Sequence, residues 1–423
     1  RDQHAPAIIT AFNAATGRTY APENDAARES FLQAAQFVGR KQELRRLRQA
    51  LADAFDHQGS GWLIGGESGV GKSRLVDELR TLALVRGALV LRSAAISSGG
   101  GPYLIWRDLL RWLVLLTPVS DLEASVLQVL VPDIGDLLAR PIPPSPIVLN
   151  PADARTRLFA IVTAILHRQT RPVVIILEDL QWAELESLQL LSWINREISH
   201  HPLVLIGNYR HEERPDLPRH LPQMQQIHLR RLDYGEIAML SESMLGPNGR
   251  NASVLRLLRK ETEGNPFFLV EVVRALAEEA GHLDNIGTKS LPGRVFTGGL
   301  HQLIHRRLSH IPVADRDLLE LAAVGGRRLD LAILQALAPD TNLSQWLTTG
   351  ANAAVLEIQD DRWQFAHDKL REGVLANLSA DRKKALHQRI AQAVEAVYGD
   401  VPEVAARLAL HWGAAENVQK EKH

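Results

Sequence analysis

One short segment combines glycine, lysine and serine at a spacing that suits phosphate binding. It matches the pattern G-x-x-x-x-G-K-[ST] without a mismatch and reads Gly66-Glu67-Ser68-Gly69-Val70-Gly71-Lys72-Ser73. An apolar run, 61–64, precedes it, and a segment of helical spacing begins at Arg74. A strand, a glycine loop and a helix N-terminus together surround a small anion with backbone N–H groups. The segment therefore predicts a phosphate-binding loop in which Lys72 reaches the phosphates and the Ser73 hydroxyl binds Mg²⁺.

Two acidic residues end another apolar run, 173–177, which has the composition of a buried strand. They are Glu178 and Asp179. In phosphate chemistry, one carboxylate at such a place holds Mg²⁺, directly or through water, and the other orients the attacking water. The sequence leaves open which of the two is the principal metal-side group. It also leaves open the alternative that Asp179 caps the following helix.

Arg210 follows a further apolar run, 203–207. In a parallel sheet, ligands lie at the carboxyl ends of the strands. We therefore expect Arg210 near the γ-phosphate, where a guanidinium distinguishes ATP from ADP. The alternative for a single arginine at this place is a surface ion pair.

Five segments, taken in order, resemble the nucleotide-binding module of STAND proteins, a branch of the AAA+-related P-loop ATPases found in bacterial regulators. They read FVGR (37–40), GESGVGKSRL (66–75), VVIILEDLQWAE (173–184), LVLIGNYRHEE (203–213) and GNPFFLVEVV (264–273). The resemblance runs from about residue 37 to 412 and is weakest at 117–150. It implies that ATP or ADP, with Mg²⁺, is the ligand of the phosphate-binding loop.

The same resemblance implies nucleotide contacts outside the loop. In the family, the FVGR segment packs near the adenine, and a turn of the helical subdomain, here 264–266, also contacts the nucleotide. Pro266 suits the first turn of a helix as well. The nucleotide contacts that we expect are therefore Val38, Gly39, Arg40, Gly66, Glu67, Ser68, Gly69, Val70, Gly71, Lys72, Ser73, Arg74, Gly264, Asn265, Pro266 and His367.

His367 belongs to a segment, 365–370, that is similar to the Met-His-Asp motif of plant immune receptors and apoptosome-type switches. In those proteins, the histidine contacts the β-phosphate of bound ADP and locks the closed state. The resemblance gives His367 this role. A histidine between a strand and a helix also suits packing or capping of the helix end, and this alternative stays open.

Short apolar strands separated by helical patterns predict an α/β fold with a parallel sheet covered on both faces. The expected organisation is a linker or adaptor (1–36), a P-loop nucleotide-binding domain (37–232), a helical subdomain (233–293), a winged-helix domain (294–378) and amphipathic helices that begin a TPR-like array (379–423). We expect a flexible joint at 281–293 and an irregular stretch at 132–151.

The periodicity assigns individual elements. Strands are expected at 61–64, 88–91, 173–177, 203–207 and 226–229, with a hairpin at 355–358 and 362–365. Helices are expected at 43–55, 103–116, 156–168, 185–198, 234–245, 254–262, 266–280, 300–308, 314–324, 329–337, 343–352 and 367–378.

Composition limits the remaining possibilities. The chain has 423 residues, a hydrophobic share of 45%, a net charge of −1 and no cysteine. Disulfides and cysteine catalysis are excluded, and no overall charge attracts the chain to nucleic acid or to a membrane. No apolar run reaches the ~18 residues of a spanning helix, so we expect a cytoplasmic protein. The ends of the chain suggest a piece of something longer.

The leading functional hypothesis is an ATP/ADP-controlled signalling switch with slow hydrolysis by Lys72, Glu178, Asp179 and Arg210. No arginine finger of the kind used by hexameric motors is evident. The resemblance implies a protein signal or effector at the C-terminal repeats and ATP-dependent self-association. Residues 1–40 are similar to segments that follow Ser/Thr kinase domains, so a kinase domain upstream is a further expectation.

The alternative is a DNA-binding ATPase that uses the winged helix. The helix 343–352 contains no Lys or Arg, and the hairpin has only Arg362 at its turn. This is a poor electrostatic match to DNA, so nucleic acid is disfavoured as a partner. A scaffold with a vestigial nucleotide site is a third reading, and the complete set of phosphate and metal residues argues against it.

Overall fold

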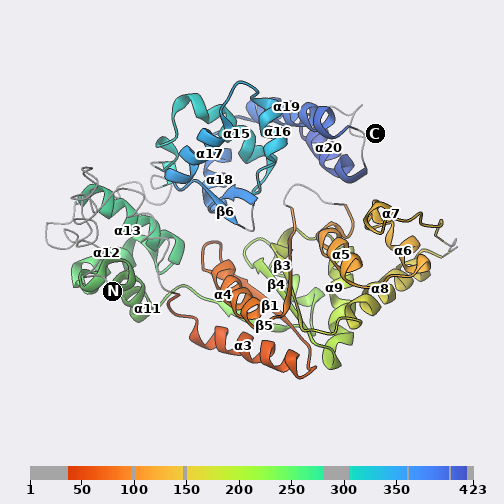
Figure 1. The fold of residues 1–423 in the computed structure, drawn as a ribbon. Helices are drawn as coiled ribbons and strands as arrows, with labels where there is room; N and C mark the ends of the chain where they lie inside the picture. Colours follow the sequence, from red (N-terminus) through yellow and green to blue (C-terminus); the bar gives the residue numbers. More distant parts are fainter. Residues whose placement is uncertain are drawn as a thin grey trace, which may run out of the picture.

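The computed structural model describes residues 37–96, 101–145, 150–280, 304–305, 307–359, 362–399 and 402–416. Figure 1 shows the arrangement of these parts. The expected linker (1–36), the expected joint (281–293) and much of the expected helix 300–308 lie outside the described residues. No helix in the described ranges is long and apolar enough to cross a membrane.

A five-stranded parallel sheet forms the centre of the first part of the chain, with the strand order β2-β3-β4-β1-β5 (Figure 1). The strands are β1 (Ser60–Gly66), β2 (Leu89–Ala94), β3 (Val173–Glu178), β4 (Leu203–Arg210) and β5 (Gln225–Leu229). Every residue of β3 and β4 is buried. A parallel sheet has helices on both faces, so these strands are buried on both sides. This burial explains why their sequences are continuously apolar. The predicted α/β fold is confirmed.

Two apolar cores lie on opposite faces of the sheet because neighbouring residues of a strand point to opposite sides. Val174 and Ile176 of β3 pack with α3 (Lys41–Phe55) and α4 (Lys72–Val85). Ile175 and Leu177 pack on the other face. The helices that cover this second face are α5 (Leu104–Leu116), α6 (Asp121–Leu127), α7 (Ile134–Leu137), α8 (Pro151–His167) and α9 (Leu185–Glu197). A short helix, α10, spans Leu217–His220.

Helix α7 lies inside the stretch that the sequence analysis expected to be irregular. Its neighbour α6, which was not predicted, begins at a capping box in which Ser120 and Glu123 satisfy each other's backbone N–H groups. The rest of 132–151 that the structure describes is irregular up to the start of α8.

Three helices with their own apolar core follow the sheet. They are α11 (Tyr234–Leu245), α12 (Ala252–Thr262) and α13 (Pro266–Ala280). Asp233 and Glu236 form a capping box at the start of α11. Val38 packs against this core from the segment that leads into α3, so the three helices stay close to the phosphate-binding loop.

The C-terminal region is mostly helical and lies over the carboxyl edge of the sheet (Figure 1). It contains α15 (Arg316–Gly325), α16 (Leu331–Leu337), α17 (Leu343–Asn352), the antiparallel pair β6 (Leu356–Gln359) and β7 (Arg362–Phe365), α18 (Asp368–Ala376), α19 (Ala380–Tyr398) and α20 (Pro402–Ala414). One apolar core joins α15 to α19 and includes Phe365 and Val394. These elements therefore form one packed unit.

Candidate nucleotide site

The phosphate-binding loop connects the end of β1 to the start of α4. Gly69 and Gly71 have φ angles of 80° and 100°, a left-handed conformation that costs glycine little. Gly71 is the N-cap of α4, and no side chain caps this end. The first N–H groups of α4 therefore remain available to an anion, with the positive end of the helix dipole behind them.

Lys72 crosses the loop that it belongs to. Its Nζ donates to the carbonyl oxygens of Gly66 and Glu67 at 2.7 and 2.8 Å. The side chain is buried, and burial lowers its pKa to about 8, although Glu212 acts in the opposite direction. A phosphate would give this desolvated ammonium a fully charged partner, which carbonyl oxygens cannot do.

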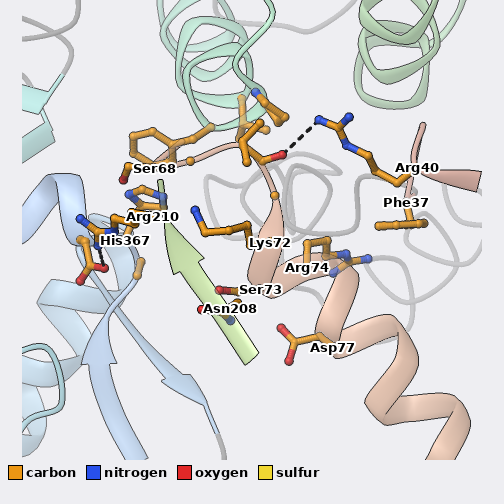
Figure 2. A pocket seen from close by; sticks show the side chains of 18 of the residues that line it. Phe37, Arg40, Ser68, Lys72, Ser73, Arg74, Asp77, Asn208, Arg210 and His367 are labelled. Atoms are coloured by element: carbon orange, nitrogen blue, oxygen red, sulfur yellow. Dashed lines mark hydrogen bonds and ion pairs between the residues drawn. The ribbon is translucent and has the colours of Figure 1, made fainter. Parts of the chain in front are cut away.

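A cavity of about 410 Å³ opens beside the loop (Figure 2). The predicted residues that line it are Val38, Arg40, Ser68, Gly69, Val70, Gly71, Lys72, Ser73, Arg74, Asp179, Arg210, Pro266 and His367. Among the described residues selected from the sequence, Gly39, Gly66, Glu67, Glu178, Gly264 and Asn265 are not part of this lining. The wall also contains residues that the sequence analysis did not select, including Phe37, Asp77, Asn208, Phe267, Arg327 and Asp368.

The turn before α13 is attached to the loop. Asn265 donates from Nδ2 to the carbonyl oxygen of Ser68 at 3.0 Å, and the Phe267 N–H donates to that of Gly69 at 3.2 Å. Gly264 has a φ of 83°, and its carbonyl accepts from the Leu232 N–H at 2.7 Å. The helical part thus holds the loop through its backbone, so a change in the loop is transmitted to α13.

Arg40 fixes the opposite side of the loop. It is buried at the N-cap of α3 and donates to the carbonyl oxygens of Val70, at 3.4 Å, and Arg230. Burial lowers its pKa, against the effect of Glu236. The FVGR segment therefore connects the loop to the residue that follows β5.

Asn208 organises the two acids at the end of β3. Its Oδ1 accepts from the Asp179 N–H at 3.0 Å, and its Nδ2 donates to Glu178 Oε1 at 3.1 Å. Asp179 has a φ of 55° and lines the cavity, whereas Glu178 is turned away from it. Burial and the nearby Asp368 carboxylate raise the pKa of Asp179. The structure thus gives the two acids different surroundings.

Arg92 of β2 explains the position of Glu178. Its Nε donates to Glu178 Oε2 at 2.6 Å, and its Nη1 donates to Asp77 Oδ1 at 2.9 Å. Burial alone would raise the pKa of Glu178, but the charge and hydrogen bond of Arg92, together with Arg327 and Asn208, outweigh burial and lower it. With Asn208 on one oxygen and Arg92 on the other, Glu178 is fully engaged. The local sequence around Arg92 did not indicate these partners.

The oxygen groups in the cavity wall fit a magnesium ion. Ser73, Asp77 and Asp179 all line the cavity, and Mg²⁺ prefers oxygen ligands. Within the described ranges, no group of three or more His, Cys, Asp and Glu side chains is close enough to hold a metal alone. Mg²⁺ sites of this chemistry use one or two carboxylates together with substrate phosphates. The ion would neutralise charge on those phosphates.

Replacement of Arg92 by glutamine should make the protein respond to magnesium. Without the guanidinium, Glu178 and Asp77 lose the cation that they share, and a divalent cation becomes the best replacement for its charge. We expect a lower melting temperature in EDTA and a recovery of about 2–3 kcal/mol of stability when Mg²⁺ reaches ~100 times its Kd. The measurement is thermal unfolding with and without Mg²⁺. Arg74→Gln is the matched control because Arg74 is exposed and its ion pair among the described residues is with Glu78. An equal response of both variants would contradict the role of Arg92.

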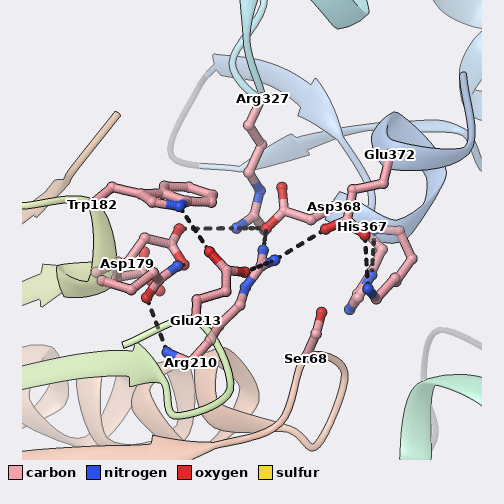
Figure 3. Close-up of polar contacts among 12 residues, drawn as sticks. Ser68, Asp179, Trp182, Arg210, Glu213, Arg327, His367, Asp368 and Glu372 are labelled. Carbon is pink, nitrogen blue, oxygen red and sulfur yellow. Dashed lines mark hydrogen bonds and ion pairs between the residues drawn. The ribbon is translucent and has the colours of Figure 1, made fainter. Parts of the chain in front are cut away.

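Arg210 lies in the cavity wall, and two of its acidic partners come from the C-terminal region (Figure 3). Its Nη2 forms an ion pair with Asp368, and its Nη1 contacts Glu372 at 3.0 Å and Glu213 at 2.8 Å. Burial would lower its pKa, but Asp368 and the other acids outweigh burial and raise it. The guanidinium also lies 5.2 Å from the centre of the Trp182 ring. Arg210 therefore joins the end of β4 to α18.

Arg327, in the loop after α15, approaches Asp368 and also Asp179. Its Nη1 is 3.6 Å from Asp368 and 3.7 Å from Asp179 (Figure 3). Burial opposes its charge, but Asp368 and Asp179 outweigh burial and raise its pKa. Two arginines and two aspartates thus alternate across the boundary between the sheet and the C-terminal region. No motif in the sequence indicated Arg327.

His367 is the N-cap of α18, and its Nδ1 accepts from the Lys369 N–H at 3.1 Å. Its ring stacks on Phe267 of α13 with centroids 3.7 Å apart. Burial, with Arg327 and Arg210 nearby, lowers its pKa to about 3 although Asp368 acts in the opposite direction. The neutral ring therefore carries its proton on Nε2. His367 caps a helix, as one of the two alternatives requires, and it also lines the cavity.

Comparison with known proteins finds a family model that is similar to part of this chain. Residues 36–206 match the AAA ATPase domain family. The matched segment contains the phosphate-binding loop, Arg92 and the Glu178–Asp179 pair. The AAA ATPase match and the parallel sheet support a nucleotide-dependent ATPase, for which Mg²⁺ is the usual companion of the nucleotide.

A solved structure extends the likeness beyond the AAA ATPase segment. It is a Signal Transduction ATPase with Numerous Domains (STAND) protein with a tetratricopeptide repeat sensor from Pyrococcus horikoshii. The identity is 17%, the TM-score is 0.54, and the likeness covers 90% of this chain and 48% of that one. The predicted resemblance to STAND proteins is thus confirmed for the fold.

A curated relative is the uncharacterised protein of Rhizobium meliloti (strain 1021) that is 24% identical over 390 residues. The match covers 84% of this chain and 37% of the relative. This chain therefore spans about a third of the length of that relative and about half of the STAND protein.

Proposed function

We propose that this chain is the nucleotide-controlled switch of a signalling protein, held closed by ADP and opened when ATP replaces it. The observation that carries the proposal is the ion pair between Arg210 and Asp368. Arg210 stands where a strand-end residue meets the γ-phosphate in a P-loop site, yet its charge is used to hold α18. One residue therefore both reads the nucleotide and closes the molecule.

The closed arrangement suits ADP. His367, which offers an Nε2–H donor, and Lys72 both line the cavity, so both are available to a β-phosphate. A γ-phosphate would compete with Asp368 for Arg210, because both are anions that bind a guanidinium. ATP would then weaken the attachment of α18, which we assign with α15–α17 and the β6–β7 hairpin to a winged-helix domain.

Hydrolysis by this arrangement would be slow. Lys72 and Ser73 would hold the phosphates and Mg²⁺, and Asp179, with its raised pKa, is suited to orient or deprotonate a water. Arg210 and Glu178 are, however, engaged by Asp368 and Arg92 in the closed form. Both must change partners before they contribute to catalysis, so hydrolysis follows opening and returns the switch to its ADP form.

The rest of the switch follows from its energetics. A change from one extreme population to the other requires a differential affinity of ~5.5 kcal/mol, which the γ-phosphate and a protein partner would supply together. We assign the partner to the helical repeats that begin with α19 and α20, and we expect self-association of the open form. An effector such as a kinase domain belongs to the longer protein in this proposal.

The direct test is the nucleotide that co-purifies with the protein, measured together with its mass in solution. ADP in a monomer, and assembly after exchange for ATP, is the expected result. ATP in a monomer that never exchanges or hydrolyses it would favour a scaffold, and a salt-sensitive shift of duplex DNA would favour the DNA-binding alternative.

Replacement of His367 by alanine should weaken ADP retention about ten- to hundredfold, because it removes a helix cap and a hydrogen-bond donor to phosphate. Release of a fluorescent ADP analogue measures the effect, and self-association should rise in parallel. His367→Asn is the matched variant, since asparagine keeps the cap of α18 but lacks the ring that stacks on Phe267. Unchanged ADP affinity in His367→Ala would show that the histidine is not the lock.

A further inference from the structure

A second cavity, of about 630 Å³, lies between the nucleotide-binding part and the C-terminal region. One wall contains Leu104 and Arg107 of α5 together with Trp182, and another contains the loop 325–331 after α15. Arg362, at the start of β7, and Arg371 of α18 complete the basic part of the lining. Asp179 and Arg327 line both this cavity and the nucleotide cavity. The two sites are therefore neighbours with different walls.

Several arginines of this second cavity have no acidic partner in the part of the chain that the structure describes. Within the residues that the structure describes, no ion pair involves Arg107, Arg328 or Arg362; Arg107 donates only to the Leu130 carbonyl at 3.2 Å. Arg371 likewise donates from Nε to a backbone carbonyl, that of Ala323, at 2.7 Å. Guanidinium groups stay charged at all accessible pH values, so their charges must be balanced by solvent or by a ligand.

The lining contains more arginines than acids, and at least two of its acids, Glu178 and Asp330, already have arginine partners. Glu178 pairs with Arg92, and Asp330 pairs with Arg407 at 2.7 Å. Burial lowers the pKa of Arg328; Glu178 opposes this, but Arg362, Arg92 and Arg327 lower the pKa further. The arginines are thus close enough to repel one another. An excess of positive charge remains in the cavity.

We propose that this cavity binds a small phosphate-bearing metabolite. The planar fork of arginine matches phosphate oxygens in pairs, and arginines from several elements would converge on one such group. The volume is within the range of small-molecule sites. Leu104, Trp182 and Leu329 add apolar surface for the non-phosphate part of the ligand.

The ligand would stabilise the closed form. Arg107 comes from the sheet side, whereas Arg328, Arg362 and Arg371 come from the C-terminal region, so the site is complete only when the two parts are together. A ligand that binds one conformation better must shift the equilibrium towards it, and its effect on ADP is reciprocal. This coupling rests on the proposed switch, whereas the existence of the site does not.

The site itself is tested on Lys72→Ala protein, in which the phosphate-binding loop no longer competes for the probe. Equilibrium dialysis with radiolabelled pyrophosphate at constant ionic strength should show saturable binding of one equivalent. Binding should weaken at least tenfold when Arg328→Gln and Arg362→Gln are added, and should be unchanged by Arg45→Gln on the exposed face of α3. Absence of saturable binding, or equal binding in all variants, would overturn the proposal. Citrate or a glutamate-rich peptide binding as tightly as pyrophosphate would overturn the assignment to phosphate.

The coupling is tested on the unmodified protein loaded with a fluorescent ADP analogue. Pyrophosphate should slow release of the analogue several-fold, and the Arg328→Gln/Arg362→Gln variant should lose this effect while it still binds ADP. Faster release in both proteins would mean competition at the phosphate-binding loop and would overturn the stabilising role. If the protein does not retain ADP at all, the result counts against the proposed switch. The dialysis experiment would still test the second site independently.

Discussion

Lys72→Ala protein is expected to bind ADP and ATP at least about a hundredfold more weakly than the unmodified protein. The substitution removes the only cation within the phosphate-binding loop 66–73. Charge-assisted hydrogen bonds contribute about 1.5–3 kcal/mol each, and each 1.4 kcal/mol changes the affinity about tenfold. Lysine can offer two or more such bonds to the β- and γ-phosphates. Isothermal titration with ADP measures the loss.

Two controls make this result interpretable. Lys41→Ala removes an exposed lysine at the start of α3 and should leave the affinity unchanged. Thermal unfolding of Lys72→Ala must show a folded protein, because the loop loses the contacts of Nζ with Gly66 and Glu67. A folded variant with undiminished ADP affinity would show that the nucleotide is bound elsewhere.

Asp368→Asn is expected to have the largest effect on nucleotide retention among the residues of the C-terminal region. Its carboxylate faces Arg210 and Arg327, and the Arg210 and Asp368 side chains are only 5% and 8% exposed. Removal of one partner from a buried pair costs about 3–5 kcal/mol, because the remaining charge stays desolvated. The closed form should lose this stabilisation, so ADP should be released about two to three orders of magnitude faster.

Stopped-flow release of a fluorescent ADP analogue, with the oligomeric state measured in parallel, tests this expectation. Glu372→Gln should have a much smaller effect, since Glu372 is 41% exposed and solvent screens its contact with Arg210. Asp340→Asn, at an exposed turn, is the neutral control. If Asp368→Asn protein releases ADP as slowly as the unmodified protein, the Arg210–Asp368 ion pair does not stabilise the closed form.

Much of the fold was accessible from local sequence. The apolar runs 173–177 and 203–207 correspond to β3 and β4, and the helices expected at 234–245, 266–280 and 343–352 have those bounds in the structure. These elements are buried on one or more faces, and burial imposes the periodicity that makes them readable. Helix α6 was missed although the capping box at Ser120 was a signal for it.

Part of the candidate site could likewise be predicted from the sequence, and part could not. The phosphate-binding loop is readable because one continuous segment makes it. Arg92 and Arg327 were not readable, because their partners are distant along the chain and are brought near only by the strand order and by closure of the C-terminal region. Arg92 and Glu178 are 86 positions apart. The positions of Glu178, engaged by Arg92, and of Asp179, in the cavity, likewise depend on neighbours that no local pattern specifies.

Gly69 shows how the neighbouring helices restrict variation of the loop. The phosphate-binding pattern accepts any residue at this position. In this chain a Cβ at position 69 would lie 2.9 Å from Asn265 Oδ1 and 2.9 Å from the Cβ of Phe267, and the φ of 80° is itself unfavourable for other residues. A side chain at position 69 would therefore push the loop and the start of α13 apart. Positions 69, 265 and 267 therefore cannot change independently during evolution, and a descendant that replaces Gly69 is expected to carry a compensating change in the turn before α13.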